Sequence, residues 1–405
     1  MTETGPRLLT SLPEAFDEGP AWFRTLRERA AGSLRDHGLP TKKTEAWRFT
    51  PVRSIVDGSF DREDDGLPRV TSPLPDGVTV RSLRDVLAEE PSLLEDRLGR
   101  TPVDHFGALN TSLFTDGLWI HVAASVAAGS VIELDHGFAG SAPSSPTVRY
   151  PRVLVTLEPG SQATLIETYG GDRPGSLTNS VMEVDLGSNA LLHHVRIHEQ
   201  NGLQVGYVDV RQDRDSRYHS VVATLGGALL RFDVRVHLEA PGAQCQLDGA
   251  YFVDGSDHVD HHTLVEHKAP HCRSAQTYRG IASGRGTAVF DGIVVVHRDA
   301  QKTEAHQENR NLLLSETATV HTKPHLEIDA DDVVCSHGAT VGSLDHDQLF
   351  YLRARGIPED MARAILTYAF IEAVVDRVSD PATRERLREA VLARIPEGEA
   401  IRGVT

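Results

Sequence analysis

Residues 279–344 have the sequence RGIASGRGTAVFDGIVVVHRDAQKTEAHQENRNLLLSETATVHTKPHLEIDADDVVCSHGATVGSL, and they carry the strongest structural signal in this 405-residue chain. Short apolar segments alternate here with turns rich in Gly, Asp, Asn and Ser; the segments are residues 288–290, 293–296, 312–314, 326–328 and 333–335. Each segment is too short for a helix and rich in β-branched residues, which predicts strands. Short strands that turn corners without intervening helices indicate a solenoid, in which each coil buries its face against the next.

A weak internal repeat extends this prediction from about residue 115 to about residue 341. A strand end, a tight turn and a small residue recur at residues 157–163, 186–190, 238–245 and 314–318. The small residue fits because neighbouring coils stack about 4.7–4.9 Å apart. The irregular spacing excludes a hexapeptide repeat and suits a right-handed parallel β-helix whose coils vary in length.

Helical segments precede the predicted β-helix. Residues 20–37 show an amphipathic pattern, and residues 81–99 are also predicted to be helical. Between them, residues 41–52 are predicted to form a polar loop anchored by Trp47 and Phe49, followed by a linker rich in Asp, Gly and Pro.

Two more helices are predicted near the C-terminus, one opened by Pro358 and one by Asp380 with Pro381. The first is apolar nearly all round, whereas a surface helix shows one apolar stripe. It is therefore either sandwiched within the chain or keeps one face for a partner. Together the patterns predict a mainly β fold in three regions: an N-terminal helical region and linker at 1–110, a parallel β-helix core at 111–345 and a C-terminal helical domain at 346–405.

The composition limits the possible functions. A net charge of −17 argues against nucleic-acid binding, which needs a net basic face. The three dispersed cysteines, Cys245, Cys272 and Cys335, predict no disulfide framework and indicate a reducing, cytosolic setting. The chain has no Gly-Lys dipeptide and no G-x-S-x-G elbow, so neither a Walker A nucleotide site nor a hydrolase site is predicted. It starts without a signal-peptide pattern, and its longest apolar-leaning run is shorter than the ~20 residues of a membrane span, so we expect a cytoplasmic protein.

The sharpest chemical feature is the pair Cys335 and His337. If residues 334–338 form a strand, period-two alternation places both side chains on one face. The pair then has two interpretations. It ligates a metal through a sulfur and an imidazole, or it is an ordinary buried strand cysteine with a histidine at the sheet edge.

A second candidate is the run DHVDHHTLVEHKAPHC at residues 257–272, which holds five histidines and a cysteine. Its spacing matches no zinc template and contains no H-E-x-x-H motif. Pro270 separates His267 from His271 and would break a helix that presented them together. We expect a structural or surface role for this run, with a self-contained iron or zinc site as the alternative.

Three segments resemble the SufB/SufD family, the scaffold subunits of the SUF iron–sulfur assembly machine: VFDGIVVVHRDAQKTEAHQENRNLLLS at residues 289–315, CSHGAT at 335–340 and QLFYLRARGI at 348–357. Within the family, Cys-Ser-His-Gly-Ala-Thr and the shorter chain resemble the D subunit. The B subunit is longer and typically has a glutamate after the corresponding histidine, where this chain has Gly338.

The resemblance implies a parallel β-helix and a non-enzymatic role. It implies pairing with a SufB-like subunit and binding of a SufC-like ABC ATPase, and it allows a homodimer when the chain is alone. It places His337, with Cys335 as the lesser ligand, at a subunit interface where an iron–sulfur cluster is held transiently and shared with the partner. One histidine and one cysteine cannot complete a cluster, so other ligands must come from elsewhere. The family's ATPase-contacting region corresponds here to Gln348, Tyr351, Arg353, Arg355 and Ile357.

Two rival functions come from the residues themselves. One is a β-helix carbohydrate-active enzyme that uses Asp329, Asp331 and Asp332 with a metal, which requires a complete site in one chain. The other is a stand-alone histidine-rich iron or zinc binding protein that uses residues 258–272.

Overall fold

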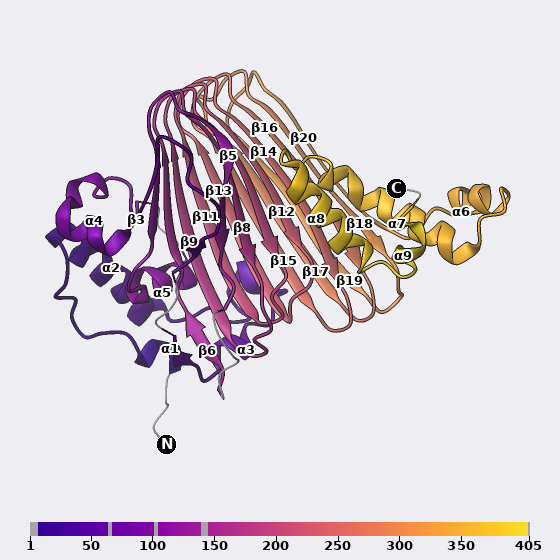
Figure 1. Ribbon diagram of the computed structural model, residues 1–405, viewed down its shortest axis with the longest axis horizontal. Coiled ribbons are helices and arrows are strands. Elements are labelled where there is room, and N and C mark those ends of the chain that lie inside the picture. The colour runs from indigo at the N-terminus through magenta and orange to yellow at the C-terminus, as the bar shows by residue number, and fades with distance from the viewer. Residues whose placement is uncertain (1–6, 64–66, 101–103, 139–144, 404–405) are drawn as a thin grey trace.

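The computed structural model describes residues 7–63, 67–100, 104–138 and 145–403, and these form a two-sheet solenoid with helices on both sides (Figure 1). Among the described residues the first sheet has 11 strands: β1 (Asp61–Arg62), β3 (Val78–Ser82), β4 (Leu118–Val122), β6 (Thr147–Arg149), β7 (Arg152–Leu157), β9 (Leu177–Leu186), β11 (Leu203–Gln212), β13 (Leu229–Leu238), β15 (His258–His267), β17 (Thr287–Val296) and β19 (Thr319–Ile328). The second sheet has nine in the same part of the chain: β2 (Arg69–Val70), β5 (Ala127–Asp135), β8 (Gln162–Tyr169), β10 (Leu191–His198), β12 (Arg217–Thr224), β14 (Gln244–Val253), β16 (Arg273–Ala282), β18 (Glu304–Leu313) and β20 (Val334–Gly342).

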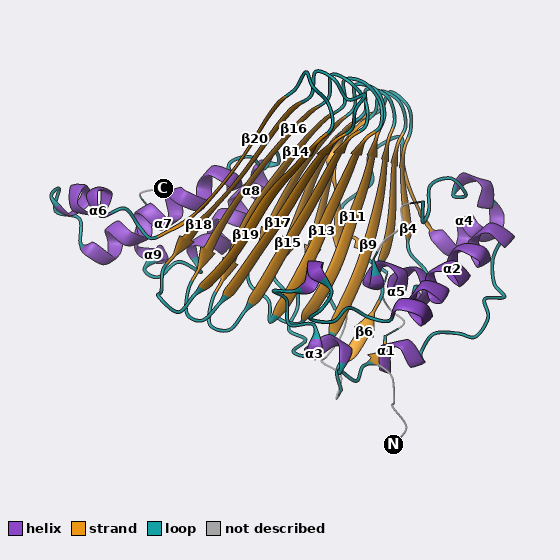
Figure 2. Ribbon diagram, turned by 180° about the vertical axis from the view of Figure 1, so that it is seen from behind, coloured by secondary structure: helices purple, strands orange, loops and turns teal. Residues whose placement is uncertain are grey.

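From β7 and β8 onward, each sheet grows by parallel pairing of every second strand in the sequence. Thus β11 pairs with β13 and β13 with β15 in the first sheet, while β14 pairs with β16 and β16 with β18 in the second. The antiparallel pairs β3–β4 and β2–β5 start the two sheets. The predicted class, a mainly β parallel solenoid flanked by helices, is confirmed (Figure 2).

The strands are longer than the apolar segments that predicted them. Residues 288–290 and 293–296 belong to one strand, β17, which continues through Asp291 and Gly292. Likewise, Leu312 and Leu313 end β18, and Leu314 follows it; the strand also contains Gln307 and Asn309, both buried. Apolar runs marked only part of each strand because the inner face of the solenoid also carries polar side chains.

An apolar core fills the space between the sheets along most of the solenoid. Val236 and Val265 of the first sheet are fully buried, as are Leu247 and Val253 of the second. Each such side chain stabilises the fold by roughly 1.5–3 kcal/mol relative to an exposed one. This core holds successive coils in register and so positions the strands at the end of the solenoid.

Helices of the N-terminal region pack on the outer face of the first sheet, where they cover Leu154, Val181 and Val205. They are α1 (Arg7–Thr10), α2 (Ala21–His37), α3 (Arg53–Val56), α4 (Leu83–Glu89) and α5 (His105–Leu113), with short 3-10 helices at Glu45–Trp47 and Pro91–Leu93. The helix predicted at 20–37 is confirmed by α2. The helix predicted at 81–99 is wrong beyond Glu89, because a proline within a helix removes a backbone hydrogen bond and Pro91 begins a separate turn.

The C-terminal helices are α6 (His346–Arg353), α7 (Glu359–Val375), α8 (Pro381–Leu392) and α9 (Gly398–Ile401). Helix α7 lies on the outer face of the second sheet against β14 and β16, with α8 and α9 packed beside it. Its all-round apolar character therefore has an internal explanation: the helix is sandwiched within the chain. Asp380 caps α8 as predicted, because its side chain accepts a hydrogen bond of 2.7 Å from the Thr383 amide. No helix in the described part of the chain is long and apolar enough to span a membrane.

Neutral histidines inside the solenoid predict a loss of stability in mild acid. Burial lowers the pKa of His261 and of His267 to about 4. Between pH 6.5 and 4 the unfolded chain therefore binds more protons at these sites, and the free energy of unfolding falls as the pH falls. The expected loss is about 2 kcal/mol per histidine at pH 5.

This loss is measured by urea unfolding at pH 7 and pH 5, with His261→Gln as the matched variant. Burial opposes protonation of His262 and His237, but nearby acids raise the pKa of both, so these two add stability below pH 6.5 and offset part of the loss. His261→Gln should lose less stability than the parent between the two pH values. An unchanged difference would contradict the assignment of His261 as a buried neutral group.

Candidate functional site

Cys335 and His337 lie on β20, the last strand of the second sheet. In the described part of the chain β20 pairs with β18 alone. Cys335 is in register with Ala305 and His337 with Gln307, and both of these β18 residues are buried. Cys335 packs against the core between the sheets, and alternation places His337 on the same inward face. Both residues therefore belong to the inner surface at the open end of the solenoid.

The inward-facing side chains in register with His337 on the preceding strands are polar, and some of them contact the opposite sheet. Two coils before His337, Thr263 donates a hydrogen bond of 2.7 Å to the Gln276 Oε1 atom on the opposite sheet. In the next layer Gln307 extends toward β17, where a Cβ on Gly292 would lie 2.1 Å from the Gln307 Nε2 atom. A Cβ at position 292 would therefore force the Gln307 amide to move. Neither polar atom of the buried Gln307 amide has a hydrogen-bond partner among the described residues.

The surface at this end of the solenoid is uncovered. Val334 and Val341 of β20 are 62% and 45% exposed, and Ile328 of β19 is 41% exposed. His337 is exposed, whereas Cys335 is half-buried. Burial raises the pKa of the Cys335 thiol, which disfavours the thiolate needed for metal ligation. The imidazole is thus the more available ligand of the pair.

The residues predicted to contact an ATPase lie on α6 and the turn after it, which project beyond the solenoid (Figures 1 and 2). Arg353 forms an ion pair of 3.3 Å with Glu359, and the Arg355 guanidinium lies 3.5 Å from the Tyr351 ring centroid. Ile357 is half-buried against the C-terminal core. The structure brings Gln348, Tyr351, Arg353 and Arg355 to an exposed surface and leaves Ile357 partly inside.

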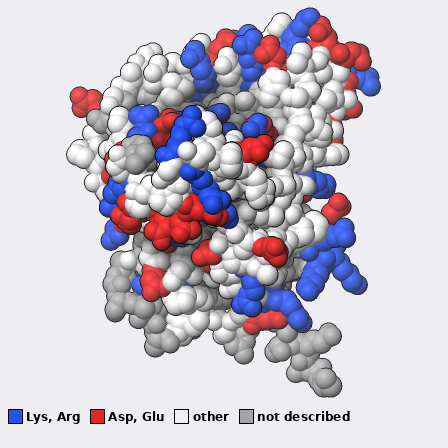
Figure 3. All heavy atoms as spheres, turned by 90° about the vertical axis from the view of Figure 1, so that its right-hand side faces the viewer, with Lys and Arg blue, Asp and Glu red and all other residues white. Residues whose placement is uncertain are grey.

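Sequence reasoning missed Phe350, which is 73% exposed beside Tyr351 at 54%. Two adjacent exposed aromatic side chains on a projecting helix are the signal that could have identified it. Figure 3 shows the molecule from the side on which α6 lies, where acidic and basic side chains are interspersed. The exposed surface of α6 thus combines an apolar aromatic pair with charges of both signs.

The histidine-rich run is distributed rather than clustered. On β15, His261 and His267 face the interior, where they contact Thr224 and Ser274. His258 and His262 lie on the outer face. In the described residues no group of three or more His, Cys, Asp or Glu side chains is arranged to hold a metal ion. His261 and His267 thus contribute hydrogen bonds inside the solenoid, and a structural role for the whole run stays a prediction.

The three aspartates of the carbohydrate-enzyme alternative lie in the turn between β19 and β20. Asp329, Asp331 and Asp332 are all exposed, and Asp332 is paired with Lys302. None of them lines the pocket of about 520 Å³ on the first sheet or the groove of about 510 Å³ on the second sheet. This arrangement does not support a glycosidase site.

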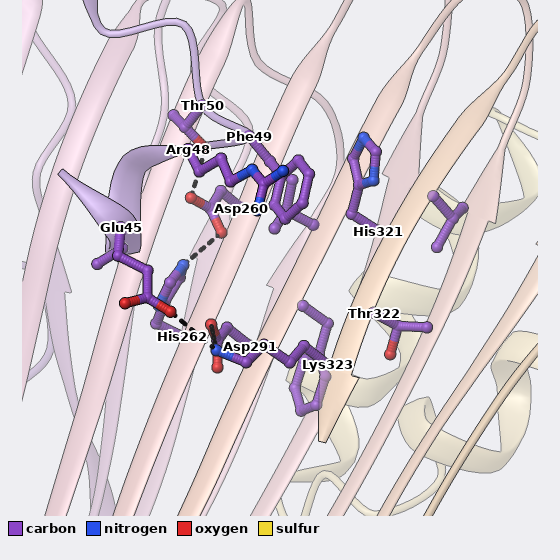
Figure 4. Close-up of a pocket in the computed structure, with 14 residues that line it drawn as sticks. Glu45, Arg48, Phe49, Thr50, Asp260, His262, Asp291, His321, Thr322 and Lys323 are labelled. Carbon is purple, nitrogen blue, oxygen red and sulfur yellow. Dashed lines mark hydrogen bonds and ion pairs between the residues drawn. The ribbon is translucent and has the colours of Figure 1, made fainter. Parts of the chain in front are cut away.

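A pocket of about 520 Å³ lies on the outer face of the first sheet, between residues 45–50 and strands β15, β17 and β19 (Figure 4). The Thr50 hydroxyl donates a hydrogen bond of 2.5 Å to Asp260, whose other oxygen lies 2.9 Å from His262. Phe49 stacks on His321 with ring centroids 4.1 Å apart. The acidic and basic side chains of this pocket are thus largely paired with one another. These pairs hold residues 45–50 against the first sheet.

This pocket was not predicted, although residues 41–52 were expected to be anchored by Trp47 and Phe49. Trp47 is buried as expected, whereas Phe49 remains 44% exposed at the pocket rim. Lys323 lies 3.7 Å from Glu45 and 3.8 Å from Asp291, so it bridges the loop and the sheet.

Comparison with known proteins gives consistent matches over most of the chain. The family models described as "SUF system FeS cluster assembly, SufBD core domain" and "SufBD protein N-terminal region" match residues 138–370 and 55–134. The chain is 32% identical to the iron–sulfur cluster assembly protein SufD of Escherichia coli, covering 88% of this chain and 89% of that protein. It is 25% identical to SufD of Bacillus subtilis (96% and 97% covered) and 30% identical to the chloroplast protein ABCI7 of Arabidopsis thaliana (95% and 89% covered).

Proposed function

Because the chain belongs to the SufBD family of iron–sulfur cluster assembly proteins, we propose that it is a non-enzymatic, SufD-like scaffold subunit of a SUF-type assembly complex. The observation that carries this proposal is the open last coil, where Cys335 and His337 lie on an uncovered inner surface. The three cysteines are free, which suits a reducing compartment, and we place the protein in the cytoplasm.

A SufB-like subunit pairs with this end of the solenoid. Strands β19 and β20 each have one neighbour in their sheet among the described residues, so each offers a row of backbone groups to another chain. Pairing there continues both sheets and covers Ile328, Val334 and Val341. When the chain is alone, a second copy can use the same edges.

The iron–sulfur cluster is transient cargo at this interface. His337 supplies an imidazole ligand, and Cys335 is its lesser neighbour. Two ligands leave a cluster incomplete, so the partner supplies the others. Gln307 is the register partner of His337 on β18. Neither polar atom of its buried amide has a hydrogen-bond partner among the described residues, so the amide is available to bond a group at this site.

An ABC-type ATPase docks on α6 and the following turn. The exposed aromatic pair Phe350 and Tyr351 offers the apolar contact, and Arg353 and Arg355 border it. Deleting residues 346–405 would not test this, because it would also remove α7 and α8. Those helices cover Phe252 and Ile281 on the second sheet.

A double substitution of Phe350 and Tyr351 to Asp is expected to abolish co-purification of the ATPase. Both side chains are exposed, so the melting temperature should change little. Leu74→Asp is the matched control, since Leu74 is 42% exposed in the N-terminal region. Retained ATPase binding by the α6 variant would refute this docking site.

The complex itself is tested by purification of the tagged chain from its own cells under reducing conditions. A SufB-like protein and an ABC ATPase should co-purify in stable stoichiometry. The isolated chain should hydrolyse no ATP, because its sequence lacks a Walker A motif. Hydrolysis by the chain free of the ATPase would refute the non-enzymatic role.

A further inference from the structure

Two histidines lie side by side on the outer face of the second sheet, away from the open end of the solenoid. His193 on β10 is in register with His219 on β12. Their Nδ1 atoms are 3.3 Å apart, and the rings meet edge to face at 72°. Both side chains are half-buried and line a groove of about 510 Å³. The pair therefore forms part of the wall of this groove.

A buried carboxylate fixes the orientation of one ring. The His219 Nε2 atom donates a hydrogen bond of 3.0 Å to the Asp248 Oδ2 atom. The other Asp248 oxygen accepts hydrogen bonds from Arg377 (2.6 Å) and Gln246 (2.8 Å), so the fully buried carboxylate acts as an acceptor throughout. The proton on His219 is thereby held at Nε2, and the Nδ1 lone pair faces His193. A carboxylate that orients a histidine in this way is a recurrent feature of metal sites.

The separation of the two nitrogens matches that of two ligands on one ion. Imidazole nitrogens bound to a tetrahedral zinc ion at about 2.0–2.1 Å lie about 3.3–3.4 Å apart. We propose that His193 and His219 bind one divalent first-row transition-metal ion of the zinc class through their Nδ1 atoms. Water fills the remaining positions from the groove. Imidazole is a ligand that this class of ion prefers.

The pair is distinct from the other histidines of the same face. His306 lies on the same outer row three strands along, and its Nδ1 atom hydrogen-bonds the Ser336 hydroxyl at 2.8 Å. Arg217 and Arg273 border the groove, so an anionic ligand on the open positions of the ion would be stabilised. This site does not depend on the scaffold role proposed above.

The test is a zinc titration of the purified full chain, followed by calorimetry. The chain has 20 histidines, and several of them can bind zinc weakly. The measured quantity is therefore the affinity and number of the tightest zinc sites, compared between the parent and each variant. His193→Gln and His219→Ala should each remove that class, whereas His306→Ala should retain it. Asp248→Asn should weaken it by about 10–100-fold. Melting temperatures without metal identify any variant that has not folded, and the conservative His193→Gln keeps the test valid if His219→Ala does not fold.

Binding of cobalt(II) in place of zinc provides a spectroscopic measurement that is independent of calorimetry. The parent and His306→Ala should show the intense visible bands of a tetrahedral ion, and both pair variants should lack them. If His193→Gln and the parent bind zinc alike, the pair is a simple N–H···N hydrogen bond and the proposal is wrong. A weak octahedral cobalt spectrum in the parent would overturn the tetrahedral site.

Discussion

His337→Ala is expected to abolish iron–sulfur cluster maturation in cells while the protein keeps its melting temperature. His337 is exposed at the open end of the solenoid, and substitutions at such positions usually change stability by less than about 0.5 kcal/mol. A cluster ligand that acts only in the assembled complex does not contribute to the stability of the isolated chain, so its removal should leave folding unchanged. A buried packing histidine would behave differently, because its removal leaves a cavity or an unsatisfied partner.

The experiment combines maturation of a reporter iron–sulfur enzyme with thermal unfolding and co-purification of the partner subunits. His306→Ala is the matched control, because His306 is an exposed histidine on the adjacent strand with its side chain on the opposite face. Cys335→Ser should give a milder defect than His337→Ala. Normal maturation in His337→Ala, or failure caused by unfolding, would show that the site is assigned wrongly.

Arg196→Met is expected to produce the largest loss of stability, through an ionic cluster inside the solenoid. Arg196 is 1% exposed and lies 3.2 Å from Glu167, which is fully buried. His136 and His194 contact the same carboxylate at 2.7 and 2.9 Å. Burial alone would raise the pKa of Glu167, but Arg196 and the two histidines hold it well below its ordinary value. The carboxylate is therefore charged and depends on its partners.

Removing one partner of a buried ion pair leaves an uncompensated charge and costs about 3–5 kcal/mol. Arg196 also packs between the Tyr169 and Phe232 rings, so methionine is the substitution that best keeps its volume. The midpoint of urea unfolding measures the loss. The double variant Arg196→Met with Glu167→Gln should recover part of it, because the stranded charge is gone.

Arg310→Met provides the control for this experiment. Arg310 forms a surface ion pair of 2.6 Å with Glu308, and pairs of this kind contribute about 0–1 kcal/mol. If Arg196→Met costs no more than Arg310→Met, the interior cluster does not stabilise the solenoid. No recovery in the double variant would show that the loss comes from packing instead of charge.

Local features of this protein followed from its sequence, because neighbouring residues decide them. Alternation along a strand predicted the shared face of Cys335 and His337, and Asp380 with Pro381 marked the start of α8. The solenoid class was also predictable, since short strands, tight turns and small residues recur along the chain. The family resemblance added the candidate function to these patterns.

Strand length, by contrast, depended on packing between coils. Polar side chains such as Gln307 and Asn309 face inward in β18, so hydrophobicity marked only part of the strand. The sequence also could not decide whether α7 is buried within the chain, because its apolar surface fitted both packing inside the chain and binding of a partner. The sheet face that covers it comes from β14 and β16, far earlier in the chain; for example, Arg279 of β16 donates a hydrogen bond to the Phe370 carbonyl of α7 across a separation of 91 residues.

The sequence alone thus predicted the class of fold and the shared face of Cys335 and His337 on the last strand. Tertiary structure decided which coil is last, and so why His337 is exposed while Gln307, one coil earlier, is buried. It also decided which polar side chains meet, as with His193 and His219, which are 26 residues apart. The physical reason is that the coils vary in length, so stacking of whole coils, and not sequence spacing, sets which side chains become neighbours.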